Sequence, residues 1–439
     1  MSLLNIARRI IFWSLDFIKG SPIRNHYNEI NQILGNPNSK KSTERRKELL
    51  DYILNHAVNS APIYSTYKTF RSLQDFPVIN KILIQENYNA FKSTAYLNKK
   101  QYKVSTSGST GVPFTVYQNK NKKYRNTADT IYLFEQIGYK IGFKLYQLTN
   151  WDELNKGYLK LKFQNIIKLD ISKINDNKID SIIKILKKNK FPKYFLGIAS
   201  SFESICKYLD KINSLPININ AKFFIAYSDS LNDYTANAIK KYFNAPIISR
   251  YSNAEQGQIA QQKLTNDNYF YINWASYYVE ILNINHDIPA KEREIGRIVI
   301  TDLFNFSMPL IRYDTGDLGV FELNKFNEIC LVQIEGRKMD AIYDTSGKLI
   351  SAYSINPEFH KYYENIVQYQ FIQIKRNEYI IKLNVLKKFE FEQDLINNFK
   401  KVLGNNAIIN IEYVDEIPQL SSAKRKKVLN LYHKNIKIS

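Results

Sequence analysis

Apolar residues along this chain occur in two patterns, a helical repeat and short continuous runs. The first pattern predicts helices and the second predicts buried strands. One spacing places Leu49, Leu50, Ile53 and Leu54 on a single stripe, which is typical of an amphipathic helix. The same periodicity recurs at 125–138 and 179–188. Short apolar runs that suit buried strands lie at 195–198, 223–226, 247–249 and 298–301. Helical stretches and such runs alternate through residues 179–260, which predicts α/β layering.

The pattern changes twice toward the C-terminus. Residues 269–321 contain several strand-like runs and few helical ones, which indicates a β-rich subdomain. The last hundred residues then read strand, strand, helix, strand, with Gly404 as the expected end of the helix at 392–403. The predicted fold class is therefore α/β, with a large multi-layered N-terminal domain over 1–335 and a small α+β domain over 336–439.

The N-terminal stretch from Leu3 to Ile18 is apolar but is interrupted by Arg8, Arg9 and Asp16. It is too short and too charged to span a membrane, and it lacks a small-residue cleavage site. Two interpretations stay open: a helix packed on the main body, which we favour, and a helix lying in a membrane interface. We expect a cytoplasmic protein, with peripheral contact to the inner membrane as the alternative.

Composition narrows the class of protein. The 439 residues include 62 basic and 41 acidic ones, a net charge of +21. The basic residues are spread along the chain, and only Lys424 to Lys427 form a dense run, so biased composition explains most of the charge. No recognition motif accompanies the charge, and we expect no nucleic-acid partner. Cys206 and Cys330 cannot form a disulfide framework, which favours a reducing compartment, and the sparse His and Cys residues indicate no zinc site.

The strongest local motif is the loop from Ser105 to Thr115, Ser-Thr-Ser-Gly-Ser-Thr-Gly-Val-Pro-Phe-Thr. Its two glycines let the backbone approach a ligand closely, and its hydroxyl and N–H groups suit a phosphate. It lacks the Gly-Lys-Ser/Thr ending of a Walker loop. A flexible Ser/Gly turn is the alternative.

Two further motifs follow expected strands. The stretch from Tyr251 to Gly257 offers an aromatic ring for adenine and one carboxylate, Glu255, for Mg²⁺. The stretch from Pro309 to Asp317 ends in a carboxylate that can accept both hydroxyl groups of a ribose. An exposed loop and a β-turn, respectively, are the alternatives.

Two motifs belong to the C-terminal part. Glu335 to Asp340 lies at the expected domain boundary, where Arg337 could bind ribose or phosphate and Gly336 gives a hinge its freedom. The Ser-rich stretch from Ile417 to Lys424 could deliver a cation to a site. A basic surface turn and a disordered tail are the alternatives.

The order and spacing of these five motifs resemble the adenylate-forming ligases of the acyl-CoA synthetase superfamily. The similarity is to the phenylacetate–CoA ligase-like branch, which includes the capsule-biosynthesis CapK proteins. Its most specific part is Glu294–Leu303 leading into Pro309–Asp317. Residues 56–64 and 76–81 resemble the N-terminal pattern of the branch.

The resemblance implies that ATP and Mg²⁺ activate a small-molecule carboxylic acid as an acyl-adenylate, with release of pyrophosphate. Transfer would follow to coenzyme A, to a carrier-protein thiol or to an amine, in a role tied to surface polysaccharide. It also implies a mobile C-terminal domain that turns about residues 336–340. The catalytic residues that it implies are Lys424, Glu255 and Arg337, with Glu255 also the metal ligand. The implied nucleotide-binding residues are Ser107, Gly108, Ser109, Thr110, Gly111, Ser228, Asp229, Tyr251, Ser252, Asn253, Asp317 and Arg337.

The chain also departs from the family pattern. Val112 replaces a common Lys, Ala254 replaces the Thr before the glutamate, and Ala423 replaces the Gly before the late lysine. These changes keep a second interpretation open, a protein of the same fold with reduced or no catalysis that acts as a scaffold. Tyr146, Trp151 and Phe195 are candidate walls of the acid pocket, with plain core positions as the alternative.

Overall fold

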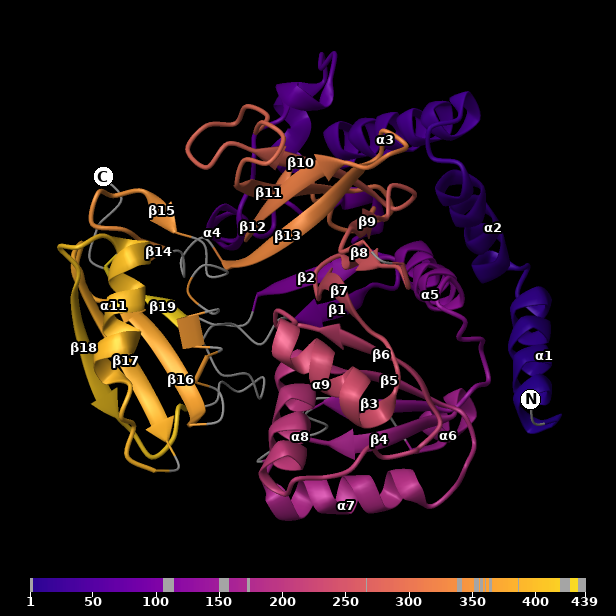
Figure 1. The fold of residues 1–439 in the computed structure, drawn as a ribbon. Helices are drawn as coiled ribbons and strands as arrows, with labels where there is room; N and C mark the ends of the chain where they lie inside the picture. The colour runs from indigo at the N-terminus through magenta and orange to yellow at the C-terminus, as the bar shows by residue number, and fades with distance from the viewer. Residues whose placement is uncertain are drawn as a thin grey trace. The chain divides into compact units, whose positions relative to one another are not determined.

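The computed structural model describes residues 3–105, 114–149, 158–171, 174–265, 267–337, 342–350, 355, 358–359, 361–362, 365–385, 387–418 and 427–432 (Figure 1). The chain divides into two compact units, Met1–Thr315 with Gly319–Gln333, and Gly316–Leu318 with Ile334–Ser439. The boundary expected from the sequence, at 335 and 336, falls inside strand β13 (Ile329–Arg337).

The first unit begins with helices. They are α1 (Leu3–Ile18), α2 (Pro22–Gly35), α3 (Lys40–Ser60), three short 3₁₀ turns (Pro62–Tyr67, Leu73–Asp75 and Thr94–Tyr96) and α4 (Lys81–Glu86). The Asn80 side chain accepts a hydrogen bond from the backbone N–H of Leu83 at 2.9 Å, so Lys81 becomes the first residue of α4. Apolar residues of α2 and α3 share one core with the segment Leu303–Tyr313. This core brings α4 beside the segment that carries Tyr313.

The largest sheet among the described residues is mixed and has eleven strands, in the order β10-β11-β12-β13-β9-β8-β7-β6-β5-β3-β4. Strands β3 to β7 pair in parallel, whereas β7, β8 and β9 pair antiparallel. The β-rich region predicted at 269–321 therefore continues the same sheet. The strands are β3 (Leu145–Thr149), β4 (Ile166–Asp170), β5 (Lys193–Ile198), β6 (Ala221–Tyr227), β7 (Ile247–Asn253), β8 (Gly257–Gln262), β9 (Phe270–Ile272), β10 (Tyr277–Leu282), β11 (Gly296–Asp302), β12 (Tyr313–Leu323) and β13.

Helices cover the parallel part of this sheet (Figure 1). They are α5 (Lys120–Glu135), α6 (Tyr158–Gln164), α7 (Asp176–Lys187), α8 (Ala199–Lys211) and α9 (Asp233–Phe243). The rings of Phe195 and Phe224 stack in the core with centroids 4.3 Å apart and planes at 6°. A separate hairpin, β1 (Tyr102–Ser105) with β2 (Thr115–Gln118), precedes α5. The helices and strands predicted at 44–57, 179–188, 195–198 and 223–226 are confirmed.

The second unit is an α+β structure, as predicted. A four-stranded sheet has the order β18-β17-β16-β19, and α11 (Glu392–Leu403) packs on it through Leu395 and Phe399. Gly404 ends α11 at φ +103, where a Cβ atom would lie 2.3 Å from Thr345 Oγ1, so glycine is required. The strands are β14 (Ile342–Tyr343), β15 (Leu349–Ile350), β16 (Ile366–Gln373), β17 (Glu378–Val385), β18 (Ile408–Tyr413) and β19 (Val428–Asn430).

Candidate functional site

Glu255 lies in the tight turn between β7 and β8. The Asn253 side chain shapes this turn, because its Oδ1 accepts from Gln256 N–H at 2.8 Å and its Nδ2 donates to Gln256 Oε1 at 2.9 Å. Gly257 has φ +121, and a Cβ atom there would lie 2.9 Å from the hydroxyl of Tyr277. The side chain of Asn253, predicted to contact nucleotide, is thus engaged in holding Glu255 in place.

The Glu255 carboxylate is almost fully buried yet has two different oxygens. Its Oε1 lies 2.8 Å from Lys81 Nζ and accepts a hydrogen bond from the Tyr313 hydroxyl at 3.2 Å. Its Oε2 makes no hydrogen bond or ion pair with any residue that the structure describes. One oxygen is therefore fixed by a cation and a phenol, and the other keeps its capacity to accept.

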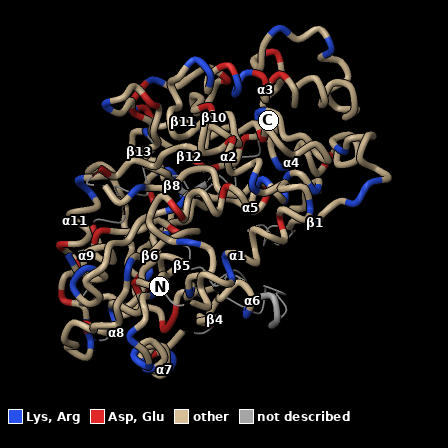
Figure 2. Tube along the Cα trace, turned by 90° about the vertical axis from the view of Figure 1, so that its right-hand side faces the viewer, with Lys and Arg blue, Asp and Glu red and all other residues tan. Residues whose placement is uncertain are grey.

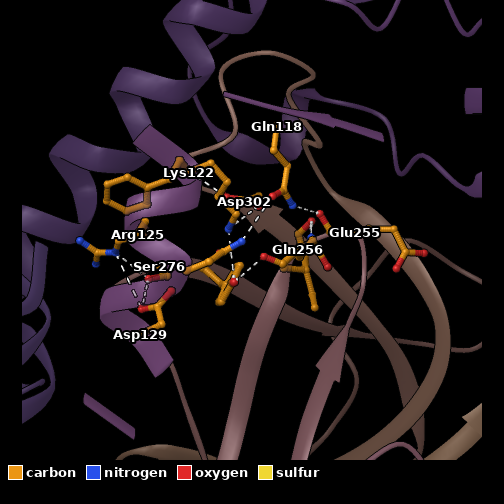
Figure 3. Close-up of polar contacts among 12 residues, drawn as sticks. Gln118, Lys122, Arg125, Asp129, Glu255, Gln256, Ser276 and Asp302 are labelled. Atoms are coloured by element: carbon orange, nitrogen blue, oxygen red, sulfur yellow. Dashed lines mark hydrogen bonds and ion pairs between the residues drawn. The ribbon is translucent and has the colours of Figure 1, made fainter. Parts of the chain in front are cut away.

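A buried polar network supports the backbone of the turn (Figure 3). Gln118 Nε2 donates to the Glu255 carbonyl at 2.9 Å, and the Tyr277 hydroxyl donates to the Gln256 carbonyl at 2.8 Å. Lys122 Nζ lies 3.3 Å from that hydroxyl and 2.7 Å from Asp302 Oδ2. Burial raises the pKa of Asp302, although Lys122 opposes the shift. The turn therefore rests on side chains from β2, α5, β10 and β11.

A second buried cation, Arg125, extends this network toward the N-terminal helices. It donates through Nε to Ser276 Oγ at 2.7 Å and through Nη1 to Glu29 at 2.5 Å, and Ser276 donates to Asp129 at 2.7 Å. Burial would raise the pKa of Glu29, but Arg125 and Arg45 outweigh it and lower the pKa. The ion pair between Arg125 and Glu29 joins α2 to α5, and so holds in place the helix that carries Lys122.

Two contacts join the motif around Tyr251 to the motif that ends at Asp317. Tyr313 bonds to Glu255, as described, and the Tyr251 hydroxyl lies 3.4 Å from Thr315 Oγ1. Gly316 follows at φ +80, with no atom that a Cβ would meet, so its backbone conformation rather than space calls for glycine. Asp317 is partly buried in β12, two residues beyond Thr315.

The hydroxyl-rich motif is described only at its ends. Ser105 pairs with Thr115 across the hairpin, and their hydroxyl oxygens lie 2.8 Å apart. Phe114 stacks against Tyr313, with centroids 6.3 Å apart and planes at 9°, and Lys81 Nζ lies 5.4 Å from the Phe114 centroid. Residues 107–111, predicted to hold phosphate, lie outside the described residues. The C-terminal end of the motif nevertheless meets the surroundings of Glu255.

Ser228 and Asp229 directly follow β6, whose last residue Tyr227 pairs with Arg250 of β7. Both therefore lie at the carboxyl end of the parallel strands, as Tyr251 does. Ser228 has φ +79, an uncommon conformation for a residue with a side chain, and Asp229 accepts a hydrogen bond from Ser200 Oγ at 2.8 Å. Ser252 pairs with Gln258 across the β7–β8 hairpin.

The two C-terminal motifs are described in part. Arg337 ends β13, and its side chain lies outside the described residues, as do Met339, Asp340 and Lys424. The backbone N–H of Ile417 donates to Gln368 Oε1 at 2.7 Å, and that of Phe371 donates to the Lys427 carbonyl at 2.8 Å. The stretch that contains Lys424 thus begins and ends beside β16.

Lys81 is the residue that sequence reasoning missed. Lys81 is the last residue of the 76–81 stretch that resembles the N-terminal pattern of the branch, and the sequence assigns it no role in the site. A lysine at the first position of a helix opposes the helix dipole, and this unfavourable placement is the available sequence signal.

Tyr146 and Phe195, candidate pocket walls, are buried and stack on each other in the core at 5.4 Å. Trp151 lies outside the described residues.

Comparison with known proteins shows a similarity to CapK proteins. The model of the CapK C-terminal domain matches residues 342–431. Protein CapK of Staphylococcus aureus is 22% identical over 440 residues, which cover 94% of each chain. The predicted resemblance to CapK is confirmed. The similarity to that protein therefore extends over nearly the whole of both chains.

Solved structures establish the fold of the CapK-like chain. A 2-hydroxyisobutyryl-CoA ligase in the postadenylation state, in complex with R3-HIB-AMP, superposes with a TM-score of 0.70 at 16% identity, covering 89% of this chain and 90% of that one. ATP-bound MatB from Rhodopseudomonas palustris superposes with a TM-score of 0.54 at 13% identity, covering 74% and 66%. The fold is that of the adenylate-forming ligases.

Proposed function

We propose that this chain activates a carboxylic acid with MgATP, forming an acyl-adenylate and pyrophosphate. One observation carries the proposal: stretches far apart in sequence meet at Glu255. Lys81 and Tyr313 contact its carboxylate, Gln118 binds its carbonyl, and Phe114 packs on Tyr313. The likeness to a CoA ligase and to MatB, both solved with nucleotide-derived ligands, supports the same reaction class.

The reaction explains why cations gather here. A carboxylate oxygen attacks the α-phosphorus of ATP, the bond from that phosphorus to the bridging oxygen breaks, and pyrophosphate leaves with the electron pair. Both reactants are anions, so positive groups must hold them together. Lys81 supplies one cation beside Glu255. In the proposal Lys424 contacts the acid and the α-phosphate, and Arg337 binds the ribose side.

The donor set fits a magnesium ion. Mg²⁺ in nucleotide sites is held by one or two carboxylates together with phosphate oxygens and water. Glu255 offers Oε2 for this purpose, while the described residues contain no cluster of three or more His, Cys, Asp or Glu that could hold a metal alone. When bound, the ion would neutralise charge that develops on the phosphates.

The nucleotide would lie at the carboxyl end of β6 and β7. Tyr251 would stack on adenine, with Ser228, Asp229, Ser252 and Asn253 around it. Residues 107–111 would hold the phosphates, and Asp317 the ribose. Residues 336–439 would form the domain that carries Lys424 and turns about 336–340.

The second step would transfer the acyl group to coenzyme A, a carrier-protein thiol or an amine, in surface-polysaccharide synthesis. The alternative is a scaffold of the same fold without turnover. It is favoured by the replacement of the usual Gly with Ala423 directly before Lys424.

Pyrophosphate release with MgATP and a panel of acids tests the proposal. We expect at least one acid to give acid-dependent release, and Glu255→Gln to slow it by about 10² to 10³. Glu44→Gln, an exposed carboxylate on α3, is the matched control and should leave the rate unchanged. No release with any acid contradicts the proposal and favours the scaffold.

A further inference from the structure

Helix α1 has the opposite orientation to that of an ordinary amphipathic helix. Helices on a protein surface bury their apolar face, whereas the apolar face of α1 points outward. Ile10 is 60% exposed and Phe17 77% exposed. The large apolar side chains that α1 exposes are Leu3, Leu4, Ile6, Ile10, Ile11, Leu15, Phe17 and Ile18.

Polar and backbone contacts fix this orientation. Asp16, the buried residue of α1, accepts hydrogen bonds from the N–H groups of Ile23 and Arg24 at 3.0 and 2.9 Å, which ties the end of α1 to the start of α2. The Asn5 carbonyl lies so close to Gly142 that a Cβ there would be 2.3 Å away. The helix is therefore seated by its inner side, and turning its apolar face inward would break these contacts.

Aromatic contacts secure the same inner side. The guanidinium of Arg24 lies 3.6 Å from the centre of the Trp13 ring, and Trp13 packs edge-on against Tyr27 at 6.2 Å. Arg9 lies 3.9 Å from Glu135 of α5. The body thus holds α1 through Trp13 and its polar residues, which leaves the aliphatic side without a partner in the described chain.

No other helix that the structure describes has such a face. The others expose at most one large apolar side chain each, such as Tyr52 on α3 and Ile185 on α7. A continuous apolar surface of this kind marks an interaction site. Helix α1 therefore packs on the main body, as expected from the sequence, and at the same time exposes an apolar face.

Basic residues surround the apolar face. Arg8 lies at one edge of this face by helical position, Arg9 lies on the inner side toward Glu135, and Lys19 follows the helix. Lys140 and Lys144 flank Gly142, which contacts α1. Figure 2 faces this side and shows α6 near α1, where Asn165 Nδ2 lies 3.5 Å from Asn5 Oδ1. Helix α6 adds the exposed Lys162 and the exposed ring of Phe163.

We propose that α1 docks this protein on the surface of an anionic phospholipid bilayer. The helix lies in the plane of the interface, with its apolar face at the acyl boundary and with Arg8 and the neighbouring lysines among the headgroups. A second copy of the chain fits the face less well, because pairing would bring the same positive groups together. No described helix combines the length and apolarity needed to cross a bilayer.

Vesicle co-sedimentation with the full chain tests the proposal. The probe is phosphatidylcholine vesicles with about one third phosphatidylglycerol, compared with phosphatidylcholine alone. We expect at least about tenfold tighter binding to the anionic vesicles, weakening as salt is added. Ile10→Asp with Ile11→Asp should weaken binding by more than about tenfold, because both side chains leave the acyl boundary.

The matched control is Ile185→Asp with Ile212→Asp, two isoleucines that are 40% and 50% exposed away from α1. This control should bind vesicles as the wild type does, and all variants should keep the wild-type unfolding midpoint. Equal binding by the α1 variant, or no binding by the wild type, overturns the proposal. A wild-type dimer that the α1 variant converts to monomer, without vesicle binding, assigns the face to a second copy instead.

Discussion

Two lysine–carboxylate ion pairs occur at and near the turn that carries Glu255. Their N···O distances are nearly equal, but their side chains differ in exposure to solvent. Lys122 and Asp302 are 2.7 Å apart with no exposed side-chain surface on either residue. Lys81 and Glu255 are 2.8 Å apart, but the Lys81 side chain is 28% exposed. A lysine–carboxylate ion pair thus occurs once with both side chains fully buried and once with its lysine accessible to water.

The difference in exposure separates support from function. A sealed pair cannot exchange a partner for a ligand, because breaking it leaves an uncompensated charge in the interior. In the pair Lys81–Glu255 water reaches the lysine, so the lysine can move toward a phosphate and a metal can take its place at the carboxylate. The pair Lys122–Asp302 therefore holds the turn, and Lys81–Glu255 is the pair that a ligand can rearrange.

The largest expected effect is on the sealed pair. Lys122→Met should lower the free energy of unfolding by about 3–5 kcal/mol, because Asp302 is left without its cation. Urea denaturation at neutral pH measures the change. The double variant Lys122→Met with Asp302→Leu should recover most of the loss. A single variant within about 0.5 kcal/mol of the wild type would show that the pair is not sealed.

The pair Glu29–Arg125 is intermediate, since Arg125 is fully buried and Glu29 is 20% exposed. Glu29→Gln should lower the free energy of unfolding by about 1.5–3 kcal/mol at pH 7. The folded-state pKa of Glu29 is lowered, so its contribution is present above the ordinary pKa of 4.5 and is lost as the pH falls through the folded value. The difference between variant and wild type should therefore shrink below pH 4.5. A difference that grows in acid contradicts the assignment.

The accessible pair should show the smallest effect on stability. Lys81→Met should lower the free energy of unfolding by about 1–2 kcal/mol, because the nearly buried Glu255 loses its cation but keeps the Tyr313 hydroxyl, and water reaches the place of the lysine. The same variant should slow pyrophosphate release by at least about tenfold, since a cation beside the phosphates is lost. A large loss of stability with unchanged turnover would place Lys81 with Lys122 as a structural residue.

Local sequence pattern predicted part of the site and tertiary packing decided the rest. Tyr251 and Glu255 were predicted because they directly follow an apolar strand. Lys122 reads as a surface lysine on a helix, and only the fold brings Asp302 and Tyr277 to it. Lys81 was missed for the same reason, because its partner Glu255 lies far along the chain.

The fold shows the same limit. Alternating apolar positions predicted strands within 269–321, but periodicity carries no information on which strands pair. The register of β8 with β7 and β9 makes that region continue the central sheet. The sequence offers the Asn253 side chain to a nucleotide, and it does not reveal the local hydrogen bonds to Gln256 that hold the turn.

A crystal structure with Mg²⁺ and a non-hydrolysable ATP analogue tests the central claim most directly. We expect the metal about 2.1 Å from a carboxylate oxygen of Glu255, with the triphosphate along residues 107–111. A nucleotide bound at another surface, or a metal with no contact to Glu255, would contradict it.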